Sequence, residues 1–152
     1  IGLCLALGFS MLEYVSISGI KQRGTMADIR SAVERSAGEA RALAAQADRV
    51  HIFWLYGYLF FGSIAKAVDE ITRAAKAGAR WIVVDLALVP AVDASGVHGL
   101  VDLAKDLERE GVMLILTGMV RRLALAVENA GGVAVAVTLD FGLERIEEAI
   151  LR

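Results

Sequence analysis

The stretch WIVVDLALVPAVDASG, residues 81–96, decides the fold. It opens with an apolar run whose one aspartate is Asp85, as expected of a strand covered on both faces of a sheet. A short loop follows, and Ser95 then stands at the start of a helical pattern that runs to Gly111. This order of strand, loop and helix places the Ser95 hydroxyl at the carboxyl edge of a parallel sheet, where open α/β folds keep their functional residues. The positive end of the helix favours a phosphate on Ser95 or bound beside it.

Strand and helix patterns alternate along the rest of the chain from Val50 onward. Runs of β-branched and aromatic residues predict strands, and apolar residues spaced three and four apart predict helices. The predicted strands cover residues 50–56, 81–86, 112–116 and 133–137, and the predicted helices cover residues 64–75, 97–107, 120–130 and 143–150. Such alternation predicts an α/β fold with a mainly parallel sheet and right-handed crossovers.

The chain begins with an apolar segment, because the first twenty residues hold one charge, Glu13. Its first twelve residues are uncharged. This uncharged run is shorter than the stretch of about 20 apolar residues that spans a bilayer. We therefore expect residues 1–20 to be the C-terminal end of a transmembrane helix. Lys21, Arg23 and Arg30 follow it, as basic residues do at a cytosolic exit. The alternative is a buried helix in the core of a soluble protein.

Residues 21–48 are predicted to form a connector helix between this segment and the alternating region. Thr25 and Asp28 have the spacing of a variant capping box, so a helix is predicted from about residue 26 to residue 47. Pairs of arginine and glutamate four residues apart predict that one helix face is solvated. These pairs are Arg30 with Glu34 and Arg35 with Glu39.

The composition narrows the classes of function. With 152 residues, a net charge of −2 and no basic stripe, the chain is about one domain, and no nucleic-acid partner is expected. The single cysteine, Cys4, excludes a disulfide framework. The sequence has no phosphate-binding loop, dinucleotide fingerprint or metal-binding His-Glu motif, so we expect no enzyme activity, no cofactor and no metal. A dyad of Ser95 with His98 is the remaining catalytic alternative, and a partly exposed helix histidine is the simpler interpretation.

The loop at residues 93–96, with Val84-Asp85-Leu86 before it, resembles the signature loop of STAS domains. These are small α/β modules found in anti-sigma-factor antagonists and at the cytosolic end of SulP-type anion transporters. Residues 55–62 are similar to the early strand of transporter-linked members, and residues 29–36 resemble the connector that precedes it. The resemblance predicts a STAS domain over residues 49–152.

The resemblance implies a role for Ser95. In the antagonists a partner kinase phosphorylates the serine before the glycine, and Ser95 has that place, while Ala94 stands where the motif often has a first serine. The predicted topology brings further residues to the loop as contacts for an anion or a partner. They are Asp85, Asp93, Gly96, Thr117 and Arg121, with Arg122 next to the last of them.

A purely structural interpretation of the same residues stays open. In it, Asp93 and Ser95 cap the helix, Asp85 bonds to loop amides, and the arginines are solvated.

As a whole, the resemblance implies a regulatory and interaction domain of a SulP-type transporter for an inorganic anion of the sulfate or bicarbonate class. The protein would lie in the inner membrane through residues 1–20, with its globular domain on the cytoplasmic side. The expected partners are the membrane domain, on the same chain or on the sister subunit of a homodimer, and a regulatory protein. The alternative is a soluble anti-sigma-factor antagonist switched by phosphorylation of Ser95.

Overall fold

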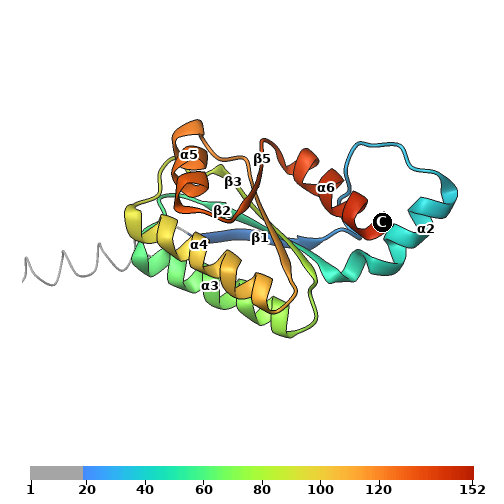
Figure 1. Ribbon diagram of the computed structural model, residues 1–152, viewed down its shortest axis with the longest axis horizontal. Helices are drawn as coiled ribbons and strands as arrows, with labels where there is room; N and C mark the ends of the chain where they lie inside the picture. The colour runs from blue at the N-terminus through green and yellow to red at the C-terminus, as the bar shows by residue number, and fades with distance from the viewer. Residues whose placement is uncertain (1–18) are drawn as a thin grey trace, which may run out of the picture.

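The computed structural model describes residues 19–152, which form an α/β fold around one five-stranded sheet (Figure 1). The elements are β1 (Gly19–Thr25), α2 (Ala37–Gln46), the 3-10 helix η1 (Ala47–Arg49), β2 (Val50–Tyr56), α3 (Phe61–Lys76), β3 (Trp81–Leu88), α4 (Ala94–Arg109), β4 (Met113–Thr117), α5 (Arg121–Ala130), β5 (Ala134–Ala136) and α6 (Leu139–Leu151). The strand order is β1-β2-β3-β4-β5. β2 to β5 are parallel and β1 is antiparallel to β2, so the predicted mainly parallel sheet is confirmed.

Hydrophobic layers cover both faces of the sheet. Helices α3, α4 and α5 pack on one face, and α2 and α6 pack on the other. The central strand β3 sends Ile82, Val84 and Leu86 into the first layer and Val83 into the second. All four side chains are fully buried. The continuous apolar run of this strand is thus explained by burial on both faces.

The helix predicted for residues 26–47 is wrong in its first half. The 26–36 segment is irregular, and α2 begins only at Ala37. The predicted capping pair does form, because the Thr25 N–H donates to Asp28 Oδ2 at 3.2 Å, but it closes a turn and no helix follows. The residues of the predicted Arg30–Glu34 charge pair therefore lie outside any helix.

A capping box starts α2. The Ser36 N–H donates to Glu39 Oε2 at 2.9 Å, and the Glu39 N–H donates to Ser36 Oγ at 3.3 Å. Hydrogen bonds from the Ser36 hydroxyl and then from its backbone N–H lower the pKa of Glu39. Since the folded-state pKa is depressed, the stability that this cap contributes is present at neutral pH and is lost as the pH falls into the acid range.

The predicted membrane segment lies outside the described residues, except for Gly19 and Ile20. These two are the first residues of β1, which pairs with β2 as far as Thr25. The sheet therefore begins in the last two residues of the predicted membrane segment and continues into the predicted connector, well before residue 49. Within residues 19–152, no helix is long and apolar enough to cross a membrane.

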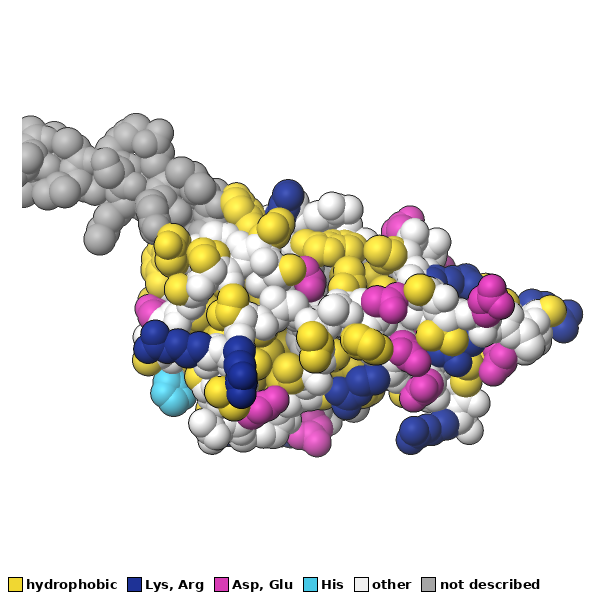
Figure 2. Space-filling view, turned by 90° about the horizontal axis from the view of Figure 1, so that it is seen from above, with side chains coloured by type: hydrophobic (Ala, Val, Ile, Leu, Met, Phe, Trp, Pro, Cys, Tyr) yellow, Lys and Arg dark blue, Asp and Glu magenta, His cyan; other side chains and the backbone are white. Residues whose placement is uncertain are grey.

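The two ends of the elongated molecule differ in surface chemistry. The starts of β1, α3, α4 and α5 lie at one end, and α2 with the end of α6 lies at the other. On the face drawn in Figure 2, hydrophobic side chains gather at the first end with basic side chains beside them. Charged side chains of both signs crowd the second end.

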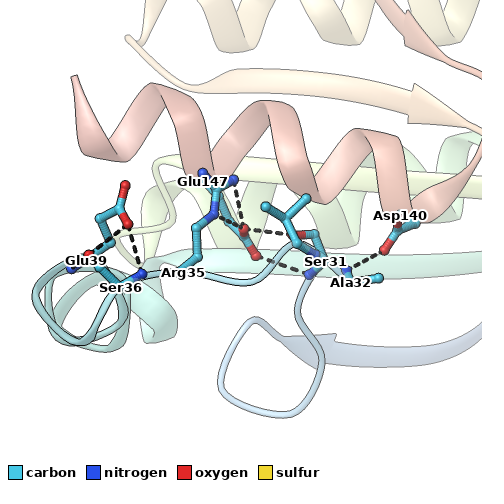
Figure 3. Close-up of polar contacts among 8 residues, drawn as sticks. Ser31, Ala32, Arg35, Ser36, Glu39, Asp140 and Glu147 are labelled. Atoms are coloured by element: carbon cyan, nitrogen blue, oxygen red, sulfur yellow. Dashed lines mark hydrogen bonds and ion pairs between the residues drawn. The ribbon is translucent and has the colours of Figure 1, made fainter.

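The buried carboxylate of Glu147, on α6, holds the 26–36 segment in place (Figure 3). It is 1% exposed and accepts hydrogen bonds from the Ser31 N–H at 3.0 Å and from the Ser31 hydroxyl at 2.7 Å. The Arg35 guanidinium completes the cluster, with both Nε and Nη2 at 3.1 Å from Glu147 Oε2. Nearby, Asp140 accepts from the Ala32 N–H at 2.7 Å. Backbone donors that a longer helix would use internally are thus bonded to α6, which explains why the helix starts late.

Candidate functional site

The candidate site lies where the parallel strands end. β2, β3, β4 and β5 end at one edge of the sheet, where α3, α4, α5 and α6 begin, and we call it the carboxyl edge. Because β1 runs the opposite way, it starts at this same edge, with Gly19 paired to Tyr56. The loops after four strands and the entry of the chain into the sheet therefore share one surface.

The loop that carries Ser95 is fixed by its backbone and by one carboxylate. Asp93 caps α4, since its Oδ1 accepts from the Gly96 N–H at 2.7 Å. The Asp93 N–H donates to the Leu59 carbonyl at 3.1 Å, and the Leu59 N–H donates to the Ala91 carbonyl at 3.2 Å. The loop is thereby held against the connection between β2 and α3. Ser95 lies exposed in the first turn of α4, and the cap belongs to Asp93 rather than to Ser95.

Asp85 and Thr117 form a buried pair beneath the edge. They are register partners on β3 and β4, and the Thr117 hydroxyl donates to Asp85 Oδ1 at 2.7 Å. Both side chains are buried. The structure thus places both side chains in the core beneath the edge, with one Asp85 oxygen bonded to the neighbouring strand. Their predicted contact with an anion or a partner stays a prediction.

A groove of about 410 Å³ runs between the Ser95 loop and α5. Arg122 is the one charged residue of its lining, whereas Arg121 is exposed and lies outside that lining. The predicted contact of Arg121 with an anion or a partner stays a prediction. The other lining residues are apolar: Pro90, Ala91, Val92, Ala94, Val97, Val120, Leu123 and Ala126. An apolar groove with one guanidinium suits an apolar side chain of a partner that also carries an anionic group.

No group of side chains that could hold a metal ion is found in the part of the chain that the structure describes. Among residues 19–152, no three His, Cys, Asp or Glu side chains come together. His98 is exposed on α4, one turn after Ser95.

Replacing Gly96 with valine should destabilise the loop. A Cβ at this position would lie 2.4 Å from Cγ1 of Val92 and 3.2 Å from the Leu59 carbonyl oxygen. Neither moves easily, because a β-branched side chain is stiff and the carbonyl is part of the backbone. Gly96→Val should lower the free energy of unfolding in urea by about 1–3 kcal/mol, as overpacking usually does. Gly38→Val, where a Cβ meets open space, is the control, and equal costs at both positions would contradict the close approach.

Replacing Ser95 with aspartate should leave the fold intact. The side chain is exposed, and the positive end of α4 accommodates a negative charge. The free energy of unfolding should change by less than about 1 kcal/mol, as is usual for surface positions. Thermal melts of Ser95→Asp and Ser95→Ala measure this. An unfolded Ser95→Asp variant would show that the position is structural and unsuited to a phosphate.

Sequence reasoning missed the Glu147 cluster. On α6, Glu147 lies next to Leu143 and Ile146 on the buried face, and Ile150 extends the stripe. A carboxylate within an apolar helical stripe is a signal for a buried polar contact. Its partners could not be found from the sequence, because Ser31 is 116 residues away.

Comparison with known proteins places this geometry in a family. The profile of the STAS domain matches residues 41–137. No curated protein matches the sequence.

Several solved structures have a similar fold. The anti-sigma factor antagonist SpoIIAA in its unphosphorylated form has a TM-score of 0.56 and 16% identity, covering 68% of this chain and 91% of its own. A sulfate transporter family protein from Wolinella succinogenes has a TM-score of 0.56 and 23% identity, covering 68% and 88%. The murine Slc26a9 anion transporter in the inward-facing state has a TM-score of 0.64 and 16% identity, covering 97% of this chain but 25% of its own length. At these identities the likeness shows a shared fold.

Proposed function

We propose that this chain, which belongs to the STAS domain family, is the cytosolic regulatory and interaction domain of a SulP-type inorganic anion transporter. In this proposal the transported anion is of the sulfate or bicarbonate class, and the transporter lies in the inner membrane. The domain itself catalyses no reaction. It contacts the membrane domain of its own chain or of a sister subunit in a homodimer.

The observation that carries the proposal is the point where the chain enters the fold. Eighteen residues with one charge, Glu13, lead directly into Gly19 at the carboxyl edge, and Lys21 and Arg23 follow. An apolar segment followed at once by basic residues is the pattern of a helix that leaves the bilayer on the cytosolic side. The likeness to the murine anion transporter covers 97% of this chain and that to SpoIIAA covers 68%, which also favours the transporter.

Features of the same edge support a regulatory role. Ser95 is exposed there, and the neighbouring groove combines an apolar lining with the guanidinium of Arg122. A phosphate on Ser95 would add about −1.5 to −2 charges to this surface. It would change the affinity for a charged partner while leaving the capped α4 in place.

The test uses the complete gene product. It is expressed in cells that lack their own sulfate uptake, and membranes are extracted with alkaline carbonate. We expect a carbonate-resistant protein that restores uptake of sulfate or bicarbonate. A protein that stays in the soluble fraction would overturn the proposal.

The second candidate is the soluble antagonist, and the exposed Ser95 hydroxyl favours it. For this candidate, the soluble protein should be phosphorylated by a partner kinase, and Ser95→Ala should abolish the incorporation of phosphate.

A further inference from the structure

The carboxyl edge carries most of the exposed apolar side chains of the described residues. Of the nine large hydrophobic side chains exposed within residues 19–152, six lie at or after the ends of β2, β3, β4 and β5. They are 47% to 80% exposed, and we call them the apolar rim: Tyr58, Phe61, Leu88, Val120, Val137 and Phe141. Single exposed hydrophobic residues are ordinary, but a set contributed by four successive connections marks a contact surface.

Basic side chains accompany the apolar rim. Arg121 and Arg122 lie in the first turn of α5, which has no acidic residue, and Lys21 lies near the start of β1. Positive charge is unfavourable in that turn, because the N-terminus of a helix is itself positive. Two arginines in a position that does not stabilise their own helix indicate an anionic partner outside the fold. The carboxylates of the edge, Asp93 and Asp140, each already accept a backbone N–H.

The chain enters the sheet at this same surface. Gly19 stands at the carboxyl edge, directly after the eighteen residues whose one charge is Glu13. If that segment lies in the bilayer, as the proposed function holds, almost no chain separates the apolar rim from the lipid. One residue spans at most about 3.6 Å, so the edge cannot move far from the membrane surface.

We infer that the apolar rim and the arginines at the start of α5 rest on the anionic surface of the lipid bilayer. The rim side chains enter the boundary between headgroups and acyl chains, and Arg121 and Arg122 contact lipid phosphates. This inference rests on the proposed function for the location of residues 1–18. It adds the lipid as a partner of the STAS domain and assigns that contact to the edge that also carries Ser95.

The test measures which end of the domain contacts lipid. Residues 1–152 carry a single environment-sensitive NBD probe on a cysteine, with Cys4→Ser as the background. The probe is attached at Val137→Cys, on the rim, or at Ala45→Cys, an exposed alanine of α2 at the opposite end of the molecule. The vesicles contain phosphatidylcholine with phosphatidylglycerol and a nitroxide lipid labelled near the headgroup. We expect the probe at Val137 to be quenched about two-fold or more and the probe at Ala45 to be unchanged.

A second pair of variants tests the basic contact without touching the apolar rim. Arg121→Gln with Arg122→Gln should weaken binding to vesicles containing phosphatidylglycerol by about five-fold for each arginine removed. Arg41→Gln with Arg49→Gln removes the same charge from exposed positions on α2 and η1 and should change nothing. All four positions are exposed, so the variants should fold alike.

The outcomes separate this inference from the proposed function. Vesicle-bound protein in which the Val137 probe stays unquenched would overturn the lipid contact, and so would a failure to bind vesicles. A Val137 probe already shielded without vesicles would also overturn it, in favour of residues 1–18 in a monomer or a second copy in a dimer. The proposed function depends instead on carbonate extraction and uptake by the complete protein. The proposed function therefore stands or fails independently of the quenching of the probe.

Discussion

Glu147→Ala should destabilise the protein by about 3–5 kcal/mol, the range for breaking a buried ion pair by removing one partner. The carboxylate is 1% exposed and binds the Ser31 N–H, the Ser31 hydroxyl and the Arg35 guanidinium. Its removal leaves a guanidinium that is only 16% exposed without its counter-charge. It also frees the 26–36 segment from α6. The melting temperature should fall by roughly 10 °C or more in a chain of this size.

Two controls separate the buried cluster from a general effect on α6. Glu148→Ala alters an exposed glutamate one residue further along the helix and should stay within about 0.5 kcal/mol. The double variant Arg35→Met with Glu147→Leu removes both charges and should recover part of the loss, because an apolar pair tolerates burial without a partner. A melting temperature of Glu147→Ala close to that of Glu148→Ala would show that the cluster does not stabilise the fold.

Gly118→Ala is expected to have the second large effect. Gly118 follows β4 with φ +69°, in the left-handed region that favours glycine. A Cβ here would also lie 2.7 Å from Asp85 Oδ1 and 2.8 Å from the backbone nitrogen of Ala87. The backbone strain costs about 1–3 kcal/mol, and the steric overlap adds about 1–3 kcal/mol. The overlap involves the Asp85 oxygen that accepts the buried hydrogen bond from Thr117. The end of the central strand should therefore loosen.

Gly111 provides a matched control for the cost of the left-handed backbone conformation. Its φ is +73°, close to that of Gly118, but a Cβ there meets no atom within 4 Å. Gly111→Ala should therefore cost only the left-handed strain, about 1–3 kcal/mol. Urea denaturation of both variants isolates the steric cost as their difference. Equal costs would show that the contact with Asp85 and Ala87 relaxes freely.

The sequence by itself determined the alternating part of the fold. The strand predicted for residues 50–56 is β2, residue for residue, and the strand predicted for residues 81–86 lengthens only to Leu88. The predicted helices after β2, β3 and β4 are all present. These elements could be predicted because their signal is local: each one buries an apolar stripe or run against the sheet, and the spacing of that stripe is written in consecutive residues.

The tertiary structure decided the N-terminal part of the described chain. The sequence of β1, GIKQRGT, is polar and has no apolar alternation, and it becomes a strand only because β2 offers its free edge. The 26–36 segment has a helix-like charge pattern, yet Glu147 and Asp140 on α6 take its backbone donors. A local sequence pattern carries no information about a hydrogen-bond partner more than a hundred residues away, so the helical prediction for this segment was wrong.

The same distinction divides the candidate site. The strand-loop-helix order was enough to predict that Ser95 opens a helix at the carboxyl edge, because each of those elements has a local signal. Whether each neighbouring side chain faces solvent or core depended on packing between strands. Asp85 and Thr117, 32 residues apart, meet as register partners and bury their polar groups together. Burial of a polar side chain is decided by which strand lies beside it, and that is a property of the assembled sheet.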